Sequence, residues 1–207
     1  MTRVEDPAAA EAKDDPALRR AGRPRDERAS QAITEAAMRQ LVEVGYANVS
    51  MESVATEAGV ARATVYRRYR DKADLVTAAI ASSAGPIGPA HPHDPKRELA
   101  KFLRHFDARF AEQCLAVMGG LIAAREEPHA LGLHRERTIL PRLRYATELL
   151  RRGQELGEID PDADLLMAVH LMVGAVMAQR ASGLTGGTGW VDDLVDWVWA
   201  ALAPHGT

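Results

Sequence analysis

The stretch from Ser50 to Lys72 constrains the fold most strongly, because it reads as two short helices joined by a tight turn. Ser50 is a suitable N-cap, since its hydroxyl can accept a hydrogen bond from a free amide of the first helical turn. Gly59 supplies the left-handed backbone conformation that ends a helix without steric cost. Small Ala55, the turn glycine and apolar Val65 have the spacing of a helix-turn-helix, in which the valine locks the second helix onto the first.

The second of these helices is basic and aromatic. Asp71 is the only acid from 62 to 72. Arginine can read guanine edges with two hydrogen bonds, and Arg, Lys, Thr and Tyr side chains can all hold phosphates. A solvated basic face would carry the same charges, but the cap, the turn and this composition together favour a DNA-reading surface. The residues concerned are Arg62, Tyr66, Arg67, Arg68, Tyr69, Arg70 and Lys72.

Residues 55–75 resemble the DNA-binding signature of the TetR (tetracycline repressor) family of bacterial regulators, with the sequence A-T-E-A-G-V-A-R-A-T-V-Y-R-R-Y-R-D-K-A-D-L. The resemblance extends upstream through G-Y-A-N-V-S-M and a preceding helix, and covers about residues 26–85. The rest of the chain is similar only in helical character and length. One departure is Ala61, which stands where many relatives have a capping serine, so that the recognition helix lacks this cap.

The resemblance implies an all-α fold of about nine helices. Residues 26–85 would form a three-helix, helix-turn-helix domain, and residues 94–207 a ligand-binding and dimerisation bundle. The implied function is that of a repressor that binds palindromic double-stranded DNA as a homodimer and is released by a small-molecule effector. The implied DNA contacts are Thr64, Tyr66, Tyr69 and Lys72 at phosphates, Arg62 and Arg67 at base edges, and Ser50.

Composition agrees with this division of the chain. The 207 residues carry a net charge of -3, but residues 19–86 carry +3 and the remainder carries -6. A basic reader joined to an acidic body is the charge distribution expected for local DNA binding. Cys114 is the only cysteine, which fits a reducing compartment. With no signal peptide and no apolar run long enough to span a bilayer, we expect a cytoplasmic protein without membrane contact.

Residues 1–25 are rich in Ala, Pro and charge and show no periodicity, so they are predicted to be disordered. The segment G-R-P-R places Arg23 and Arg25 in a thin basic arm. Such an arm can enter the minor groove over A·T tracts. A charged, mobile linker has the same composition, and both interpretations stay open.

The other expected elements follow from apolar periodicity, caps and breakers. The Gly/Pro-rich segment 85–93 is the domain boundary; its His91 and His93 have no His/Cys cluster nearby, and we expect neither metal nor cofactor. A helix over 131–156 contains Pro141, which predicts a kink. The expected helices cover 27–44 (apolar at Ile33, Ala37, Leu41 and Val44), 50–58, 62–69, 71–84, from Asp94, 115–127, 131–156, from Asp160, and 190–202.

The last two helices carry more apolar surface than a terminal hairpin needs. They are therefore candidates for a dimer interface, with monomer core as the alternative. The predicted interface residues are Val169, Val173, Val176, Trp197 and Trp199. The predicted ligand-pocket residues, each also compatible with plain core, are Phe106, Phe110, Met118, Leu121, Arg137, Tyr145, Met167 and His170.

Two other functions compete with a ligand-responsive repressor. An enzyme is conceivable through Cys114, or through His105 with Asp107, but the chain has no nucleophile elbow, phosphate loop or metal-ligand spacing. We therefore expect no catalytic activity. An architectural DNA-binding protein would keep the basic reader and need no effector cavity.

Overall fold

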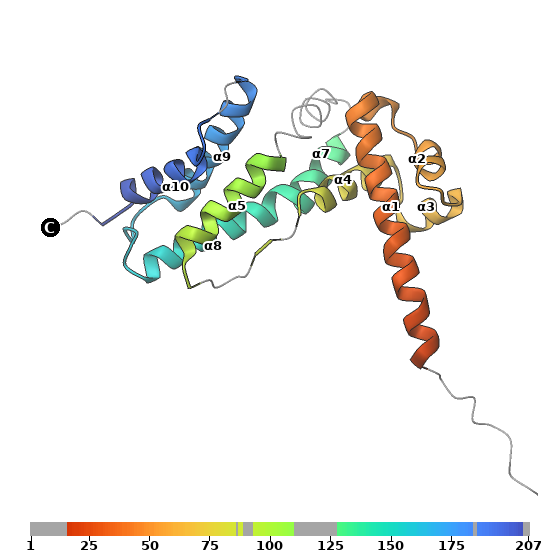
Figure 1. The fold of residues 1–207 in the computed structure, drawn as a ribbon, viewed down its shortest axis with the longest axis horizontal. Coiled ribbons are helices and arrows are strands. Elements are labelled where there is room, and N and C mark those ends of the chain that lie inside the picture. Colours follow the sequence, from red (N-terminus) through yellow and green to blue (C-terminus); the bar gives the residue numbers. More distant parts are fainter. Residues whose placement is uncertain (1–15, 86, 89–92, 110–127, 184–185, 205–207) are drawn as a thin grey trace, which may run out of the picture.

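The computed structural model describes residues 16–85, 87–88, 93–109, 128–183 and 186–204. Within these ranges the ordered elements are all helical, as predicted, and they form two parts joined by α4 (Figure 1). The elements are α1 (Pro16–Asn48), α2 (Met51–Glu57), α3 (Arg62–Arg68), α4 (Lys72–Ser83), α5 (Pro95–Arg109), α7 (Pro128–His134), the π-helix η2 (Arg135–Ile139), α8 (Leu140–Glu155), α9 (Leu165–Ala181) and α10 (Trp190–Ala201).

The N-terminal domain packs α1 to α4 around one apolar core. Ile33 and Leu41 of α1, Val54 of α2, Val65 of α3 and Leu75 of α4 are almost completely buried together. The helical stripe predicted for α1 is confirmed except at Val44, which is exposed. The stripe ends there because Gly45 adopts a positive φ of 75° and turns the backbone out of the helix.

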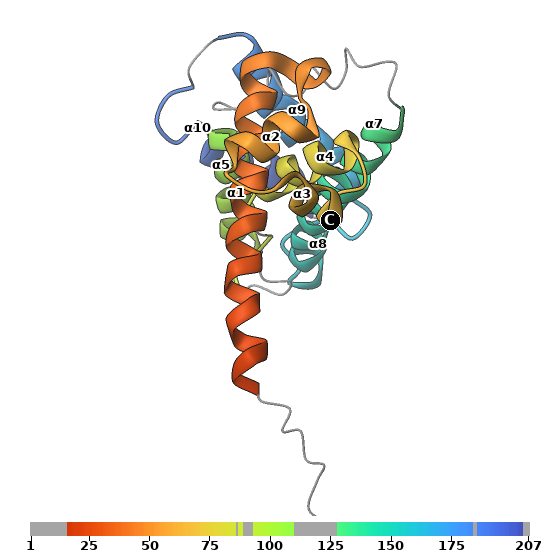
Figure 2. The same cartoon turned by 90° about the vertical axis from the view of Figure 1, so that its right-hand side faces the viewer.

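The N-terminus of α1 differs from the prediction. The helix begins at Pro16, so residues 16–25, including Arg23 and Arg25, are helical rather than part of an extended arm. Alanine and arginine are strong helix formers and proline is favoured in a first helical turn, which explains the extension. Figure 2 shows α1 as a long rod that projects beyond α2 and α3. The predicted disorder of residues 1–15 lies outside the described part.

The C-terminal body has its own core, formed between α5, α8, α9 and α10. Leu103, Leu149, Met172, Val195 and Trp199 are all buried in it. A bidentate ion pair, from Arg180 of α9 to the buried Asp107 of α5, ties two of these helices together at 2.5 and 2.6 Å. Asp107 thus has a structural partner that accounts for its burial. No helix among the described residues is long and apolar enough to cross a membrane.

The helix predicted over 131–156 is interrupted by a π turn. The amide of Leu140 donates to the carbonyl of Arg135, five residues back. Pro141, which follows, has no amide hydrogen and crowds the preceding turn, so the irregularity lies where a kink was predicted. The start of α9 was predicted wrongly: Asp160 and Pro161 form a turn, and α9 is capped by Asp164, which accepts from the amide of Met167. The predicted helix at 115–127 lies outside the described residues.

Candidate nucleic-acid interface

The first helix of the motif is fixed by reciprocal capping. Ser50 accepts from the amide of Ser53 at 3.0 Å, and the Ser53 hydroxyl closes the box at the Ser50 backbone. The same hydroxyl donates to Gln40 of α1 at 2.7 Å. The predicted cap is therefore confirmed, and it also attaches the start of α2 to α1.

The recognition helix α3 is held by packing rather than by a cap. Its N-cap is Ala61, which makes no side-chain hydrogen bond, as the departure from the family signature predicted. Val65 is fully buried and anchors the inner face. Arg62, Tyr66 and Arg67 are exposed on the remaining surface, whereas Thr64 is half-buried. Burial of a single valine thus directs the two predicted base-reading arginines to solvent.

Tyr66 is bonded to an acid that the sequence reasoning missed. Its hydroxyl donates to Glu52 of α2, although half of the side chain is exposed. This hydrogen bond raises the pKa of Tyr66 and lowers that of Glu52. Glu52 and Tyr66 lie on different helices, so no local spacing in the sequence indicated this contact. A DNA phosphate only accepts hydrogen bonds, so a phosphate contact by the Tyr66 hydroxyl requires it to leave Glu52.

Arg68 and Tyr69 turn away from the exposed face. Arg68 forms an ion pair with Asp26 and donates to Ser30 at 3.2 Å, so it joins α3 to α1. Tyr69, predicted to hold a phosphate, is half-buried against the core, and this burial raises its pKa. Its side chain therefore takes part in packing, a role that its place at the end of the helix did not reveal, and its phosphate contact stays a prediction.

Lys72 lies in the first turn of α4, where a cation is unfavourable for the helix dipole. Its ammonium group lies 4.6 Å from the centroid of the Tyr46 ring and donates to the carbonyl of Ala47 at 3.3 Å. Asp71 is the predicted N-cap and accepts from the amide of Asp74 at 2.7 Å. The side chain of Lys72 is thus oriented by the last turn of α1.

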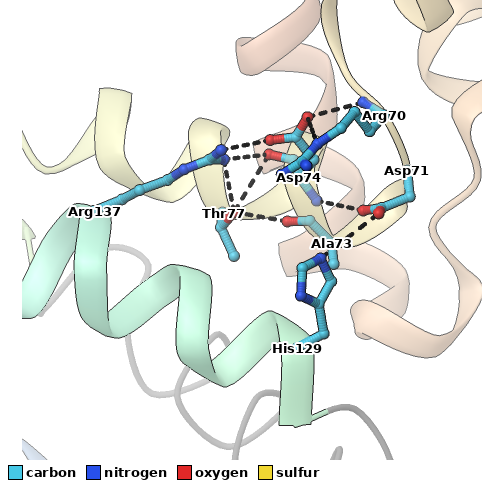
Figure 3. Close-up of polar contacts among 7 residues, drawn as sticks. All are labelled: Arg70, Asp71, Ala73, Asp74, Thr77, His129 and Arg137. Carbon is cyan, nitrogen blue, oxygen red and sulfur yellow. Dashed lines mark hydrogen bonds and ion pairs between the residues drawn. The ribbon is translucent and has the colours of Figure 1, made fainter.

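The end of the motif is also bonded to the C-terminal body (Figure 3). The carboxylate of Asp74, only 6% exposed, accepts from the amide of Arg70 at 2.8 Å and from Arg137 of η2 at 2.6 Å. Burial would raise the pKa of Asp74, but these two donors outweigh it and the pKa is lowered. The prediction of Arg137 as a ligand-pocket residue is corrected by this geometry, because its guanidinium faces α4.

A capped helix, a glycine turn and a second helix with exposed arginines, carried by a second helical domain, define a helix-turn-helix DNA-binding protein. Residues 33–85 match the family model described as "Bacterial regulatory proteins, tetR family", and residues 93–198 match "Tetracyclin repressor-like, C-terminal domain". This chain belongs to the TetR family. The predicted family, the all-α fold and the function of a transcriptional regulator are confirmed.

Individual relatives agree with the family models. The uncharacterized HTH-type transcriptional regulator YdeS of Bacillus subtilis (strain 168) is 30% identical over 159 residues, which cover 75% of this chain and 79% of YdeS. Among solved structures, the TetR family transcription regulator SCO0332 has a TM-score of 0.60 at 24% identity, covering 85% of this chain and 99% of that one. The flavonoid-responsive regulator FrrA has a TM-score of 0.64 at 19% identity, covering 87% and 100%. These two likenesses show the shared fold.

The predicted ligand-pocket residues that the structure describes do not converge on one site. Met167 and His170 are exposed on α9. They were assigned to the pocket because the apolar pattern of that helix does not show which of its faces points inward. Tyr145 is buried, with its ring against Phe102 and its hydroxyl 3.4 Å from Glu98. Burial and the neighbouring carboxylate raise the pKa of Tyr145 to about 12. Phe106 is half-buried, and Phe110, Met118 and Leu121 lie outside the described residues.

The predicted dimer residues also separate into two groups. Val169, Val176 and Trp199 are buried within the single chain, so they belong to its core and present no surface to a partner. Val173 is half-buried against the same core. Trp197 alone among the five is broadly exposed, at 70%. Positions two residues apart on one helix point to nearly opposite sides, and the apolar pattern did not separate Trp197 from Trp199.

Proposed function

We propose that the protein is a repressor that binds a palindromic operator as a homodimer and leaves it when a small-molecule effector binds the body. It acts in the cytoplasm by binding alone, without catalysis. The observation that carries the proposal is the presentation of Arg62 and Arg67 on the solvent side of α3, whose opposite side is locked by Val65. One short helix reads few bases, whereas two helices related by a two-fold axis read a palindrome.

The dimer surface we propose is an exposed apolar patch on α9 and α10. Large apolar side chains are rarely exposed together on a monomer without a partner. Leu171 and Trp197 are among the most exposed apolar side chains in the described part of the chain, and Leu166 and Met167 of α9 are exposed as well. Gly174 follows Leu171 by about one helical turn on α9 and allows close approach of a second helix. This patch replaces the buried residues first assigned to the interface.

Selection from a random pool of duplex DNA tests the proposed operator. The full chain is expected to enrich a palindrome whose half-sites lie about one DNA turn, near 34–36 Å, apart. Light scattering on the free protein is expected to give the mass of a dimer. A pool that stays random after several rounds, or a protein that stays monomeric both free and on DNA, contradicts the proposal.

For the effector site, we propose contacts around the end of α7, η2 and the start of α8. His134 and Thr138 are buried, and their Nδ1 and Oγ1 atoms have no hydrogen-bond partner among the described residues. Leaving a buried polar atom unpaired costs about 1–3 kcal/mol, so such atoms call for a bound partner. Half-buried Arg142 lies close enough to lower the pKa of His134, after burial itself. An effector that offers hydrogen-bonding oxygen atoms suits this set.

An architectural DNA-binding protein is the competing function, and effector response separates the two. A thermal-shift screen of small molecules should first identify compounds that stabilise the protein. Operator DNA is then titrated with and without each of them. Linkage requires that a compound that weakens operator binding is itself bound more weakly by the operator complex, with a coupling of about 1–3 kcal/mol. If stabilising compounds leave operator affinity unchanged, the architectural function is favoured.

A further inference from the structure

We propose that Arg137 of the C-terminal body is a positioning residue for the DNA-reading helix α3, and that it acts through the buried carboxylate of Asp74. Arg137 belongs to η2, and Asp74 belongs to α4. Neither side chain is among those we assign to DNA contacts. The inference rests on the proposed function, because its effect is read as binding to the operator.

The first link joins Asp74 to the exit of the recognition helix. The helix α3 ends at Arg68, and the amide of Arg70, two residues later, donates to Oδ2 of Asp74 at 2.8 Å. The amide of Asp74 in turn donates to the side chain of Asp71, the N-cap of α4. The short connection between α3 and α4 is therefore closed at both ends by these two carboxylates. Any rotation of the Asp74 side chain changes the path by which the chain leaves α3.

The second link joins Asp74 to the body (Figure 3). The Nη2 atom of Arg137 lies 2.6 Å from Oδ1 of Asp74, and Nη1 donates to the Asp74 carbonyl at 3.0 Å and to Oγ1 of Thr77 at 3.1 Å. A planar guanidinium that bonds a carboxylate, a carbonyl and a hydroxyl on one helix fixes the direction of approach. A lysine supplies the charge without this fork.

The third link is the π turn that carries Arg137. A π turn contains about one residue more than an α turn, so it rotates the preceding helix relative to the following one. Here the turn lies between α7, which packs along α4, and α8, which belongs to the core of the body. His129, at the start of α7, has its Nε2 atom 3.7 Å from Asp71. The π turn therefore lets one helix contact the body core with one end and the α3–α4 connection with the other.

These links predict that the body sets the orientation of α3. A displacement of η2 moves Arg137, Arg137 moves the carboxylate of Asp74, and the carboxylate carries the amide of Arg70. Loss of the ion pair should keep every phosphate-binding side chain in the protein, while α3, which presents several of them, becomes less fixed in orientation. Operator affinity should then fall without a change in the number of phosphates contacted.

The test compares Arg137→Gln, Asp74→Asn and the double variant with wild type on the selected operator, over a series of salt concentrations. We expect each single variant to lose affinity by about 5- to 150-fold, the range of a typical coupling between sites. The slope of affinity against salt should stay that of wild type, because it counts neutralised phosphates. The double variant should bind the operator no more weakly than the single variant with the lower affinity, since the two side chains act as one unit. Arg135→Gln, in the same π turn but exposed, is the matched control.

Two further measurements separate positioning from general destabilisation. Circular dichroism at the assay temperature gives the folded fraction of each variant, and hydrogen exchange should show faster exchange of the Arg70 amide in Arg137→Gln than in Arg135→Gln. If Arg137→Gln does not fold, Arg137→Lys takes its place, because lysine keeps the charge without the planar fork. Its operator affinity should also fall, by a smaller factor. The inference is overturned if Arg137→Gln binds the operator as tightly as wild type and its Arg70 amide exchanges at the wild-type rate. It is also overturned if the salt slope becomes flatter, because Arg137 would then be a phosphate contact. A wild-type protein that selects no operator contradicts the proposed function instead.

Discussion

The two domains differ in how directly their sequences specify the positions of side chains. In the N-terminal domain, α2 and α3 have seven residues each and are delimited by a capping serine, a turn glycine and one buried valine. In the body, α9 has seventeen residues, and apolar side chains are found on both its buried and its exposed sides. Short elements with local boundary signals leave one possible orientation. A long helix that is apolar on several sides leaves its orientation to tertiary packing.

Substitutions at Val176 and Trp197 sharpen this comparison and should give the largest effect. Val176→Asp places a charge in a site with no exposed surface, which should cost about 3–5 kcal/mol of unfolding free energy. Trp197→Glu changes a side chain that is 70% exposed, so the folded chain should keep its stability and lose its partner. Urea denaturation measures the first effect and light scattering the second.

The opposite pattern would reverse the assignment of these two residues. A folded monomer from Val176→Asp, or an unfolded chain from Trp197→Glu, would show that α9 and α10 are turned about their axes relative to the structure. Leu171→Glu is the matched variant on α9, because Leu171 is exposed and apolar on the same helix as Val176. It should behave like Trp197→Glu.

The sequence was sufficient to predict α2, α3 and α4 to within a few residues, but α1 begins at Pro16 rather than near Glu27. Ser50, Gly59 and Asp71 act through bonds and dihedral angles within four residues of themselves, so their effects are visible in a local pattern. The orientation of Arg68 was not predictable in this way, because its partners Asp26 and Ser30 belong to a helix about forty residues upstream. Basic composition therefore identified the reading helix but not which arginines face the solvent.

Base reading within α3 gives the next largest expected effect. Arg67 is exposed beside Tyr66, so Arg67→Ala should cost about 1–3 kcal/mol on the selected operator and relax sequence preference at one position. Lys72→Ala should weaken binding to all duplexes alike and flatten the salt dependence by about one phosphate. Titrations on operator and on scrambled DNA separate the two behaviours. If both variants bind the operator as wild type does, while folded, α3 is not the reading helix.

The capping difference between the two helices of the motif provides a smaller test. Ser50→Ala removes a cap with a reciprocal partner and should cost about 1 kcal/mol of unfolding free energy. Ala61→Ser should add a cap to α3, whose first turn makes no side-chain bond at that position, and should stabilise by a similar amount or less. Denaturation midpoints of both variants and of the double variant measure these effects. A destabilising Ala61→Ser would mean that α3 requires its N-terminal amides free for another partner.

In the body, by contrast, the functional residues depend on contacts that no local pattern encodes. Arg137 was assigned to the pocket because it is a polar group on a long helix, yet its partners Asp74 and Thr77 lie sixty or more residues upstream. The sequence predicted a kink at Pro141, and the structure has a π turn shortly before that residue. It gave no indication that the irregularity would be a π turn, which decides where Arg137 points.

The smallest expected effect is a pH dependence of the unfolding free energy, and it arises from a histidine of the C-terminal body. All seven histidines of the chain lie at position 91 or beyond, so the N-terminal domain contains none. Burial, followed by the charge of Arg142, lowers the pKa of His134 below its ordinary value of 6.5. The folded chain therefore keeps His134 neutral at pH values where the unfolded chain already binds a proton there. Because the unfolded state then holds more protons, the unfolding free energy contributed by this group is fully present above about pH 6.5 and falls as the pH drops towards the lowered pKa.

His134→Gln should abolish that part of the pH dependence. Urea denaturation at pH 7.5 and pH 5.5 should show a smaller loss of stability on acidification in His134→Gln than in wild type. His93→Gln, at an exposed position before α5, is the control and should retain the wild-type loss. The carboxylate of Asp74 has a pKa lowered from 3.8, so the ion pair with Arg137 stays formed across this interval and the interdomain contact does not contribute to the change. Equal losses in wild type and His134→Gln would mean that His134 gains a proton in the folded body, which requires an acceptor or water at Nδ1.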